Sequence, residues 1–456
     1  MKSFAIFVLA ATAAASQTGG VRRATSLPEV TIEGNAFWAD GERFYIRGVA
    51  YQPGGAADPV DPILDIESLT RDIENFKTLG INTIRVYTVD NSQNHDEGMG
   101  LLADAGIYLA LDVNTPKFSL NRADPYLSYN ENYLQSLFAT VDGFANYTNT
   151  LLFFSGNEVI NDKDTTTTAP YIRAVTRDLK NYINARGYRT IPVGYSSADV
   201  SENIEEQLQY FDCGDESSAA DFFAFNDYSW CDPSDFVKSG WEAKVEKYSG
   251  YNLPMFLSEF GCIEDERAWG EIAALYSTNM SSVFSGGLAY EYSYETNGYG
   301  IVEINDGTLT TNEDFDELVT AYAAATNPSG DGGYNANGSA SACPAQSDNW
   351  AVEDLLIPAP PADIQEYMDN GAGTGPGLSE DATTSQYGGD SYSESNVTMD
   401  GVVVASTYTG SNSSSSSSSS SGSSSSSDTS GAMSGKSASV AVSLGAFVAL
   451  GLMALF

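Results

Sequence analysis

The sequence predicts an α/β protein built on a (β/α)8 barrel, the TIM-barrel architecture. Apolar, β-rich runs alternate with longer helix-like segments across residues 26–345. Eight such pairs fit into about 300 residues, which is a usual size for one barrel. Carboxylate, amide and tyrosine side chains follow several of the runs, and the C-terminal ends of barrel strands meet at one mouth. We therefore expect one large domain with a site at that mouth.

The position of each expected element follows from the apolar runs. Each run followed by a helical segment is a βα unit, and a series of such units gives a parallel sheet. The strands are predicted at Phe44–Ala50, Ile81–Tyr87, Ile107–Val113, Leu151–Ser155, Thr190–Tyr195, Phe222–Asn226, Pro254–Leu257 and Leu288–Tyr292. Helices between them are predicted at 67–79, 130–146, 170–186 and 268–284.

Both ends of the chain resemble targeting signals. A short basic start is followed by an apolar stretch that is too short to span a bilayer, so residues 1–15 are interpreted as a secretory signal peptide, with a membrane anchor as the alternative. At the other end, small residues and a spacer precede an apolar tail, which is the pattern of a GPI-anchor signal. We expect attachment near Ser430 and removal of 431–456. A transmembrane helix is the alternative, and the lack of flanking basic residues argues against it.

The composition changes after residue 345. Residues 346–410 are rich in Pro, Gly, Asp and Ser, and we expect a poorly ordered linker with little packed core. Residues 411–430 are almost entirely Ser. Such a tract cannot bury enough apolar surface to fold, so it is expected to be a disordered, O-glycosylated stalk.

The chain is acidic, with 61 Asp and Glu against 21 Lys and Arg. This balance argues against nucleic acid and anionic lipid head groups as partners, and a monomer is expected. Four cysteines imply two disulfides in a secreted chain, with three pairings open. Because no Cys-x-x-Cys spacing occurs and His95 is alone, no metal site is expected, and no cofactor is predicted. Glycosylation sequons lie at Asn146, Asn279, Asn337, Asn396 and Asn412.

Two glutamates carry the strongest chemical signal. Glu158 ends the stretch Leu-Leu-Phe-Phe-Ser-Gly-Asn-Glu, and Glu259 lies in Pro-Met-Phe-Leu-Ser-Glu-Phe-Gly. They follow the fourth and seventh predicted strands, so both should face the mouth. Glycoside chemistry uses such a pair: one carboxyl group protonates the leaving oxygen, and the other attacks the sugar carbon or activates water.

Polar residues near these glutamates fit the same chemistry. Asn157 is placed to bind a sugar hydroxyl, Tyr228 to orient the nucleophile, and Arg85 to keep Glu259 ionised by charge pairing. Tyr290 and Tyr292 are predicted to share one face of the eighth strand. Asp112 and Arg122 flank the loop after the third strand. Each residue has a structural alternative, because an acid can cap a helix, Arg85 can satisfy strand-end carbonyls, and the tyrosines can be core rings.

Several stretches resemble one family. These are Phe144-Ala-Asn-Tyr-Thr-Asn-Thr, Phe154-Ser-Gly-Asn-Glu-Val, Arg189-Thr-Ile-Pro-Val-Gly-Tyr-Ser-Ser197, Tyr228-Ser-Trp-Cys231, Ser258-Glu-Phe-Gly-Cys262 and Phe284-Ser-Gly-Gly-Leu-Ala-Tyr-Glu-Tyr292. In order and spacing they resemble the fungal cell-wall β-1,3-glucanosyltransferases of glycoside hydrolase family 72, over about residues 28–345. The signal peptide, stalk and anchor also match that family's layout, which places the protein at the outer face of the plasma membrane, in the cell wall, or both.

The resemblance implies a retaining enzyme that cleaves a β-1,3-glucan donor internally and transfers the new end to an acceptor glucan. It implies Glu158 as acid/base and Glu259 as nucleophile. It also implies sugar-contacting or carboxylate-orienting roles for Gln52, Tyr87, Asn157, Tyr228 and Tyr290, and it includes Asp112 and Arg122 without a clear role. The rival interpretations are an endo-β-1,3-glucanase and a non-catalytic glucan-binding wall protein.

The departures from the family pattern concern cysteines. A further disulfide usual in the N-terminal half has no cysteines here, and Phe260 stands where Tyr is common. The family pattern implies the pairs Cys213–Cys343 and Cys231–Cys262. No cysteines remain for a cysteine-rich carbohydrate-binding module, which implies the subgroup without that module.

Overall fold

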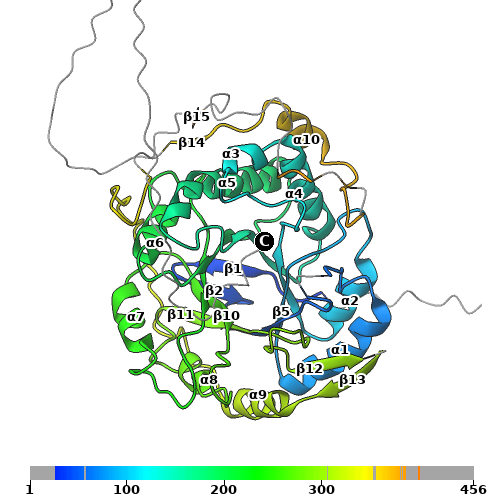
Figure 1. Cartoon of the computed structure of the whole chain (residues 1–456), viewed down its shortest axis with the longest axis vertical. Helices are drawn as coiled ribbons and strands as arrows, with labels where there is room; N and C mark the ends of the chain where they lie inside the picture. The colour runs from blue at the N-terminus through cyan, green and yellow to red at the C-terminus, as the bar shows by residue number, and fades with distance from the viewer. Residues whose placement is uncertain are drawn as a thin grey trace, which may run out of the picture.

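The computed structural model describes residues 26–55, 58–305, 307–352, 356–379, 382, 384–386 and 399–400. Its centre is a closed barrel of eight parallel strands, in which each strand pairs with the next and β11 pairs back to β4 (Figure 1). The strands are β4 (Ile46–Ala50), β5 (Thr83–Val86), β6 (Tyr108–Asp112), β7 (Thr150–Asn157), β8 (Val193–Ala198), β9 (Phe223–Asp227), β10 (Met255–Phe260) and β11 (Phe284–Ala289). The predicted barrel is confirmed.

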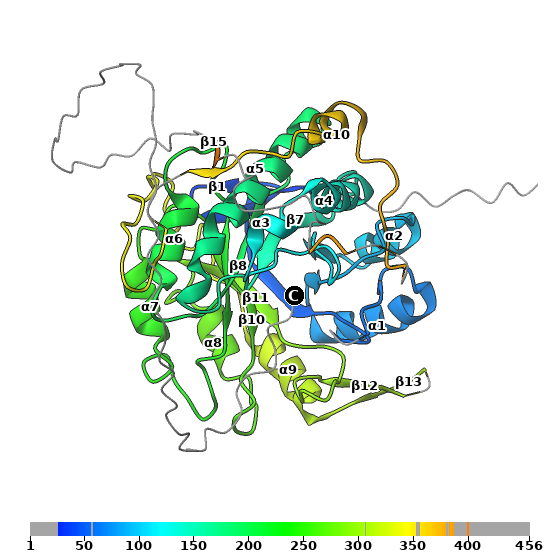
Figure 2. The same cartoon turned by 45° about the horizontal axis from the view of Figure 1, so that its top comes forward.

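Helices surround the barrel, and they alternate with its strands along the chain (Figure 2). They are α1 (Ile66–Leu79), α2 (Asp96–Asp104), α3 (Pro125–Ser128), α4 (Glu131–Phe144), the 3-10 turn η1 (Asp164–Thr168), α5 (Ala169–Ala185), α6 (Ile204–Asp212), α7 (Trp241–Tyr248), α8 (Glu271–Leu275), α9 (Glu313–Ala324) and α10 (Ile364–Asn370). Local signals set the bounds of α1, because the Asp65 side chain accepts a bond from the N–H of Ser68 and Gly80 closes the helix in the left-handed conformation.

Side chains along the barrel strands point alternately outward and inward, so the strands contribute to two apolar clusters, one between strands and helices and one inside the barrel. In β6, Leu109 and Leu111 face outward to the helices, whereas Tyr108 and Ala110 belong to a cluster inside the barrel. An antiparallel sheet of β1 (Val30–Glu33), β2 (Ala36–Ala39) and β3 (Glu42–Phe44) adds Phe37 to that inner cluster. This sheet closes the end of the barrel opposite the predicted site, and it was not among the predicted elements.

The last barrel strand begins earlier than predicted, and the helix before it is shorter. The strand spans Phe284–Ala289 rather than Leu288–Tyr292. Gly286 and Gly287 lie inside it, and their lack of side chains obscured the β pattern in the sequence. Gly286 has φ +86°, and a Cβ there would lie 2.0 Å from the carbonyl oxygen of Ile46, so the close pairing with β4 requires glycine. Turns then occupy most of the predicted helix 268–284, of which only α8 forms.

The prediction of a poorly ordered linker over 346–410 is wrong for its described residues up to 386. Trp350, Ile357 and Ile364 are almost fully buried in the main apolar cluster, and α10 lies on α4 and α5. A two-stranded sheet joins β14 (Ile357–Pro358) to β15 (Met399–Asp400). Pro and Gly content predicted an irregular backbone, but the scattered apolar residues between them are enough to pack.

Other expectations lie outside the described residues. These are the signal peptide 1–15, the stalk 411–430, the anchor signal 431–456 with Ser430, and the sequons at Asn396 and Asn412. The remaining sequons, at Asn146, Asn279 and Asn337, have exposed side chains. Among the helices that the structure describes, none combines the length and apolar character needed to cross a bilayer.

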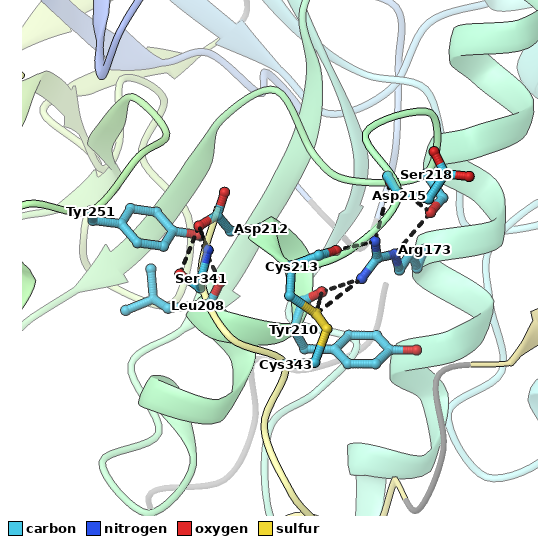
Figure 3. The surroundings of a disulfide bond; sticks show 10 residues. All are labelled: Arg173, Leu208, Tyr210, Asp212, Cys213, Asp215, Ser218, Tyr251, Ser341 and Cys343. Atoms are coloured by element: carbon cyan, nitrogen blue, oxygen red, sulfur yellow. Dashed lines mark hydrogen bonds between the residues drawn. A yellow bond between two sulfur atoms is a disulfide. The ribbon is translucent and has the colours of Figure 1, made fainter. Parts of the chain in front are cut away.

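Both disulfides form with the pairing that the resemblance implied. Cys213–Cys343 ties the end of α6 to the chain that follows the barrel, and the Arg173 guanidinium lies beside it, donating to the backbone oxygens of Tyr210 and Cys213 (Figure 3). Cys231–Cys262 joins the loops after β9 and β10. The first disulfide closes the domain, and the second lies next to the predicted site.

Removing the first disulfide should destabilise the fold more than removing the second. The pairs are separated by 130 and 31 residues, so loop-closure entropy gives about 5 and about 4 kcal/mol, respectively. Paired Cys→Ser variants, compared by the midpoint of chemical unfolding, test this order. A larger loss for Cys231 and Cys262 would contradict it.

Candidate active site

Glu158 and Glu259 lie at the mouth of the barrel. Glu158 directly follows β7, and Glu259 is the fifth residue of β10. Strands β8 and β9 lie between β7 and β10, and Glu259 is in register with Asn226 of β9. The barrel therefore brings together two carboxyl groups that are a hundred residues apart in sequence.

Three donors from two barrel segments hold the Glu259 carboxylate: Arg85 and Tyr87 at the end of β5, and Tyr228 after β9. Its Oε1 accepts hydrogen bonds from Tyr87 Oη (2.9 Å) and Arg85 Nη1 (3.2 Å), and its Oε2 accepts one from Tyr228 Oη (2.7 Å). The side chain is only 7% exposed. Both oxygens are thus occupied and the group cannot rotate freely, which orients one carboxylate in the mouth. The predicted contacts of Arg85 and Tyr228 with Glu259 are present.

Arg85 is fully buried and divides its donors between two acids. Its Nε lies 2.9 Å from Asp112 Oδ2, and its Nη2 lies 3.2 Å from Asp112 Oδ1. Burial lowers the pKa of Arg85, but the charges of Asp112 and Glu259 outweigh this effect and the net shift is upward. Asp112 is 4% exposed, so the structure places it beneath the mouth as the partner of Arg85.

The Glu158 backbone is held in an uncommon conformation. Its φ is +48°, in the left-handed region that non-glycine residues rarely adopt. The N–H of Glu158 continues the β7–β8 ladder by donating to the carbonyl of Ser196 (2.9 Å), and its carbonyl accepts a bond from Arg122 Nη2 (3.0 Å). These two bonds keep the strained residue in place, and strain of this kind is concentrated at functional sites.

An amide network supports the Glu158 side chain. Asn226 Nδ2 donates to Glu158 Oε1 (2.8 Å) and also to Asn157 Oδ1 (3.1 Å). Beneath them, Ser258 Oγ donates to Asn226 Oδ1 (2.9 Å), and Ser196 Oγ lies 2.7 Å from Asn157 Oδ1. The serines fix which way each amide points, so Asn226 presents its N–H to the carboxyl group.

Burial raises the pKa of both glutamates. For Glu158, the Asn226 bond and the charges of Arg85 and Arg122 oppose the rise. For Glu259, burial raises the pKa to about 7, Arg85 opposes it, and the Glu158 charge adds to it. That last contribution exists only while Glu158 is ionised. Since Glu259 accepts three side-chain bonds from the described residues and Glu158 accepts one, a single proton shared by the pair is best held on Glu158.

A group of tyrosine rings lies beside Glu259. The rings of Tyr228, Tyr290 and Tyr299 contact one another edge to face, with centroids 5.4–6.3 Å apart. Gln52 follows β4 and is half-buried.

The prediction for Tyr292 is wrong: it follows β11, and its hydroxyl donates to Asp72 of α1 (3.0 Å) and accepts from Asn75 (2.9 Å). The strand ends at Ala289, so the expected alternation does not extend to Tyr292.

Some residues of the site were missed as site residues. Asn226 was predicted only as the end of the sixth strand, although a polar residue at that strand end, two positions before Tyr228, was the available signal. Tyr299 gave no signal in the sequence, because it lies ten residues after the end of β11, in a loop that returns to the mouth only in the folded structure. Among the described residues, the grouping with metal-ligand spacing is Cys231, Cys262 and Glu264, and its two sulfurs are joined in a disulfide.

Comparison with known proteins agrees with this geometry. Residues 20–326 match the family described as glucanosyltransferase. The chain is 58% identical over 350 residues to the 1,3-beta-glucanosyltransferase gel1 of Aspergillus fumigatus, covering 76% of this chain and 77% of gel1. It is 52% identical to the 1,3-beta-glucanosyltransferase GAS5 of Saccharomyces cerevisiae, covering 77% and 73%.

A solved structure of Saccharomyces cerevisiae Gas2p in complex with laminaripentaose superimposes with a TM-score of 0.69 at 36% identity, covering 74% of this chain and 78% of that one. The family match extends over more than half of the chain, and each of the two relatives gel1 and GAS5 is more than half identical to it over about three quarters of both chains. The chain therefore belongs to the glucanosyltransferase family, glycoside hydrolase family 72.

Proposed function

We propose that this protein is a retaining β-1,3-glucanosyltransferase that cleaves β-1,3-glucan internally and transfers the new end to another glucan chain. The observation that carries the proposal is that two carboxyl groups at one mouth have different hydrogen-bond partners. Glu259 is held by Arg85, Tyr87 and Tyr228, whereas among the described residues Glu158 accepts one side-chain bond, from Asn226. The relatives' names and the laminaripentaose complex of Gas2p support β-1,3-glucan as donor and acceptor.

The first step is a displacement at the sugar carbon, and its reacting groups are Glu158 and Glu259. Glu158 gives its proton to the glycosidic oxygen while a Glu259 oxygen bonds to the sugar carbon, so the C–O bond to the leaving chain breaks and a glycosyl ester forms. The three donors keep Glu259 aimed at that carbon.

In the second step, Glu158 acts as a base. It has given up its proton, and the ester has removed the Glu259 charge, so the pKa of Glu158 is lower than it was in the first step. Glu158 takes the proton of an acceptor sugar hydroxyl, whose oxygen displaces Glu259 from the sugar carbon. The acceptor hydroxyl competes with water for the ester, and a site that holds the acceptor in position favours transfer over hydrolysis. The tyrosine group of Tyr228, Tyr290 and Tyr299 offers ring faces and edges beside the ester for this purpose.

The cellular setting is part of the proposal. The signal peptide would direct the chain to secretion. The GPI attachment near Ser430 and the Ser-rich stalk would then hold a glycosylated, monomeric domain outside the plasma membrane or in the wall. The four cysteines of this sequence are used in the two disulfides, which supports placement in the subgroup without a cysteine-rich carbohydrate-binding module.

The decisive experiment incubates the full chain with a reduced laminari-oligosaccharide of defined length and sizes the products. We expect products longer than the substrate. Glu158→Gln and Glu259→Gln should each reduce their formation by at least on the order of a hundredfold, because one loses the acid/base and the other the nucleophile. Glu366→Gln, at an exposed position of α10, is a matched control and should keep activity.

The alternatives give different product patterns in the same assay. Only shorter products, lost in both variants, would indicate an endo-β-1,3-glucanase. Binding of the oligosaccharide with no turnover would leave a non-catalytic wall protein. Full activity of either catalytic glutamine variant would overturn the assigned roles.

Tyr228→Phe should change the pH dependence in a defined direction. The Tyr228 hydroxyl bond lowers the pKa of Glu259, so its loss raises that pKa. Glu259 must be ionised to attack, and the low-pH limb of kcat/KM should therefore move to higher pH. We also expect kcat/KM at the optimum to fall about 10- to 100-fold, as for a bond to a charged group. Tyr147→Phe, which removes an exposed bond to Asp96, should leave the limb in place.

A further inference from the structure

A segment that follows the barrel crosses its outer surface and reaches the mouth. It comprises residues 356–379 and 384–386, and we call it the strap. In Figures 1 and 2 its gold and orange ribbon, with α10, runs over α4 and α5. The strap lies outside the region 20–326 that matches the family.

The first part of the strap is fixed to the helices. Pro358 accepts a bond from Arg177 Nη1 (2.9 Å), and the N–H of Ala372 donates to Tyr182 Oη (2.8 Å). The N–H of Gly377 donates to Asn91 Oδ1 (2.9 Å). A Cβ on Gly375 would lie 2.1 Å from that same oxygen, so the backbone fits closely against the barrel here.

The end of the strap is bonded to the loop after β6. Gln386 Nε2 donates to Pro116 O (3.0 Å) and to Ser119 Oγ (2.7 Å). Thr384 Oγ1 (2.9 Å) and the N–H of Ser385 (3.0 Å) both donate to Lys117 O. In return, Asn130 Nδ2 donates to Ser385 O (2.8 Å) and Lys117 Nζ donates to Ser379 O (2.9 Å). The loop is therefore held at both of its ends.

The same loop carries Arg122, whose Nη2 donates to the carbonyl of Glu158. Between the two held ends, the N–H of Asn121 bonds to Ser128 Oγ (2.8 Å), which keeps the loop compact around Arg122. We propose that the strap is a positioning element of the active site, which fixes the loop after β6 so that Arg122 stays against Glu158. The inference rests on the proposed function for its effect on catalysis, and on the contacts alone for its effect on the loop.

Loosening the loop should shift the pKa of Glu158 in a defined direction. The Arg122 charge lowers the pKa of Glu158, so a looser loop raises that pKa. Glu158 must be protonated in the first step, and the high-pH limb of kcat/KM should then move to higher pH. The other groups that act on Glu158 are Arg85 of β5, Asn226 of β9 and Glu259 of β10. Tyr195 of β8 also faces it. All four are placed by barrel strands.

The test compares Gln386→Met with Gln365→Met in the full chain. The first removes both bonds to the loop, whereas the second removes a bond within α10, to Asp369. We expect Gln386→Met to lower kcat/KM about threefold to tenfold, to move the high-pH limb upward, and to speed hydrogen–deuterium exchange over residues 116–130. Gln365→Met should change none of these. Thr384→Val should act in the same direction and more weakly.

A double variant separates positioning from general stability. Arg122→Gln alone should move the high-pH limb upward, and adding Gln386→Met should move it no further. An unchanged limb together with a lower unfolding midpoint would show a purely structural strap and overturn the proposal, as would unchanged exchange over residues 116–130. Absence of longer products in the unmodified protein would instead overturn the proposed transfer, while the exchange measurement would still decide the proposal about the loop.

Discussion

The ion pair between Arg85 and the acids around it is the interaction on which the site depends. A guanidinium with no exposed surface is held by Asp112 on one side and Glu259 on the other. A buried charge without a partner is strongly destabilising, so each acid requires the arginine and the arginine requires both. The same bonds that make the buried charge tolerable also aim Glu259 into the mouth. Stability and positioning are thus supplied by one set of contacts.

The rest of the mouth is arranged around that fixed carboxylate. Glu158 is held in a strained conformation, which costs on the order of 1–3 kcal/mol, and the β7–β8 ladder and Arg122 keep it there. Asn226 connects the two halves of the site, because it is in register with Glu259 and bonded to Glu158. A rigid barrel thereby presents two chemically similar groups in different surroundings, which is the condition for different roles.

The chain beyond the barrel adds a second layer of support. Trp350, Ile357 and Ile364 pack into the main apolar cluster, and the Cys213–Cys343 disulfide ties this region to α6. The strap then extends to the loop after β6. The folded unit therefore continues past the sequence stretch that defines the family, and the barrel helices on that side are covered by protein rather than solvent.

The sequence by itself determined the barrel and the pair of glutamates. Apolar runs at regular spacing indicate eight strands, and carboxylates that follow the predicted fourth and seventh strands are expected to face one mouth. It did not determine the end of the last strand, where Gly286 and Gly287 obscured the β pattern. It also did not determine the packing of the described residues between 346 and 386, whose few apolar side chains are far apart in sequence. Nor did it place Asn226, Tyr292 or Tyr299. These depend on which distant segments meet, and only the tertiary structure decides that, because hydrogen bonds and close packing between such segments leave no local periodic pattern.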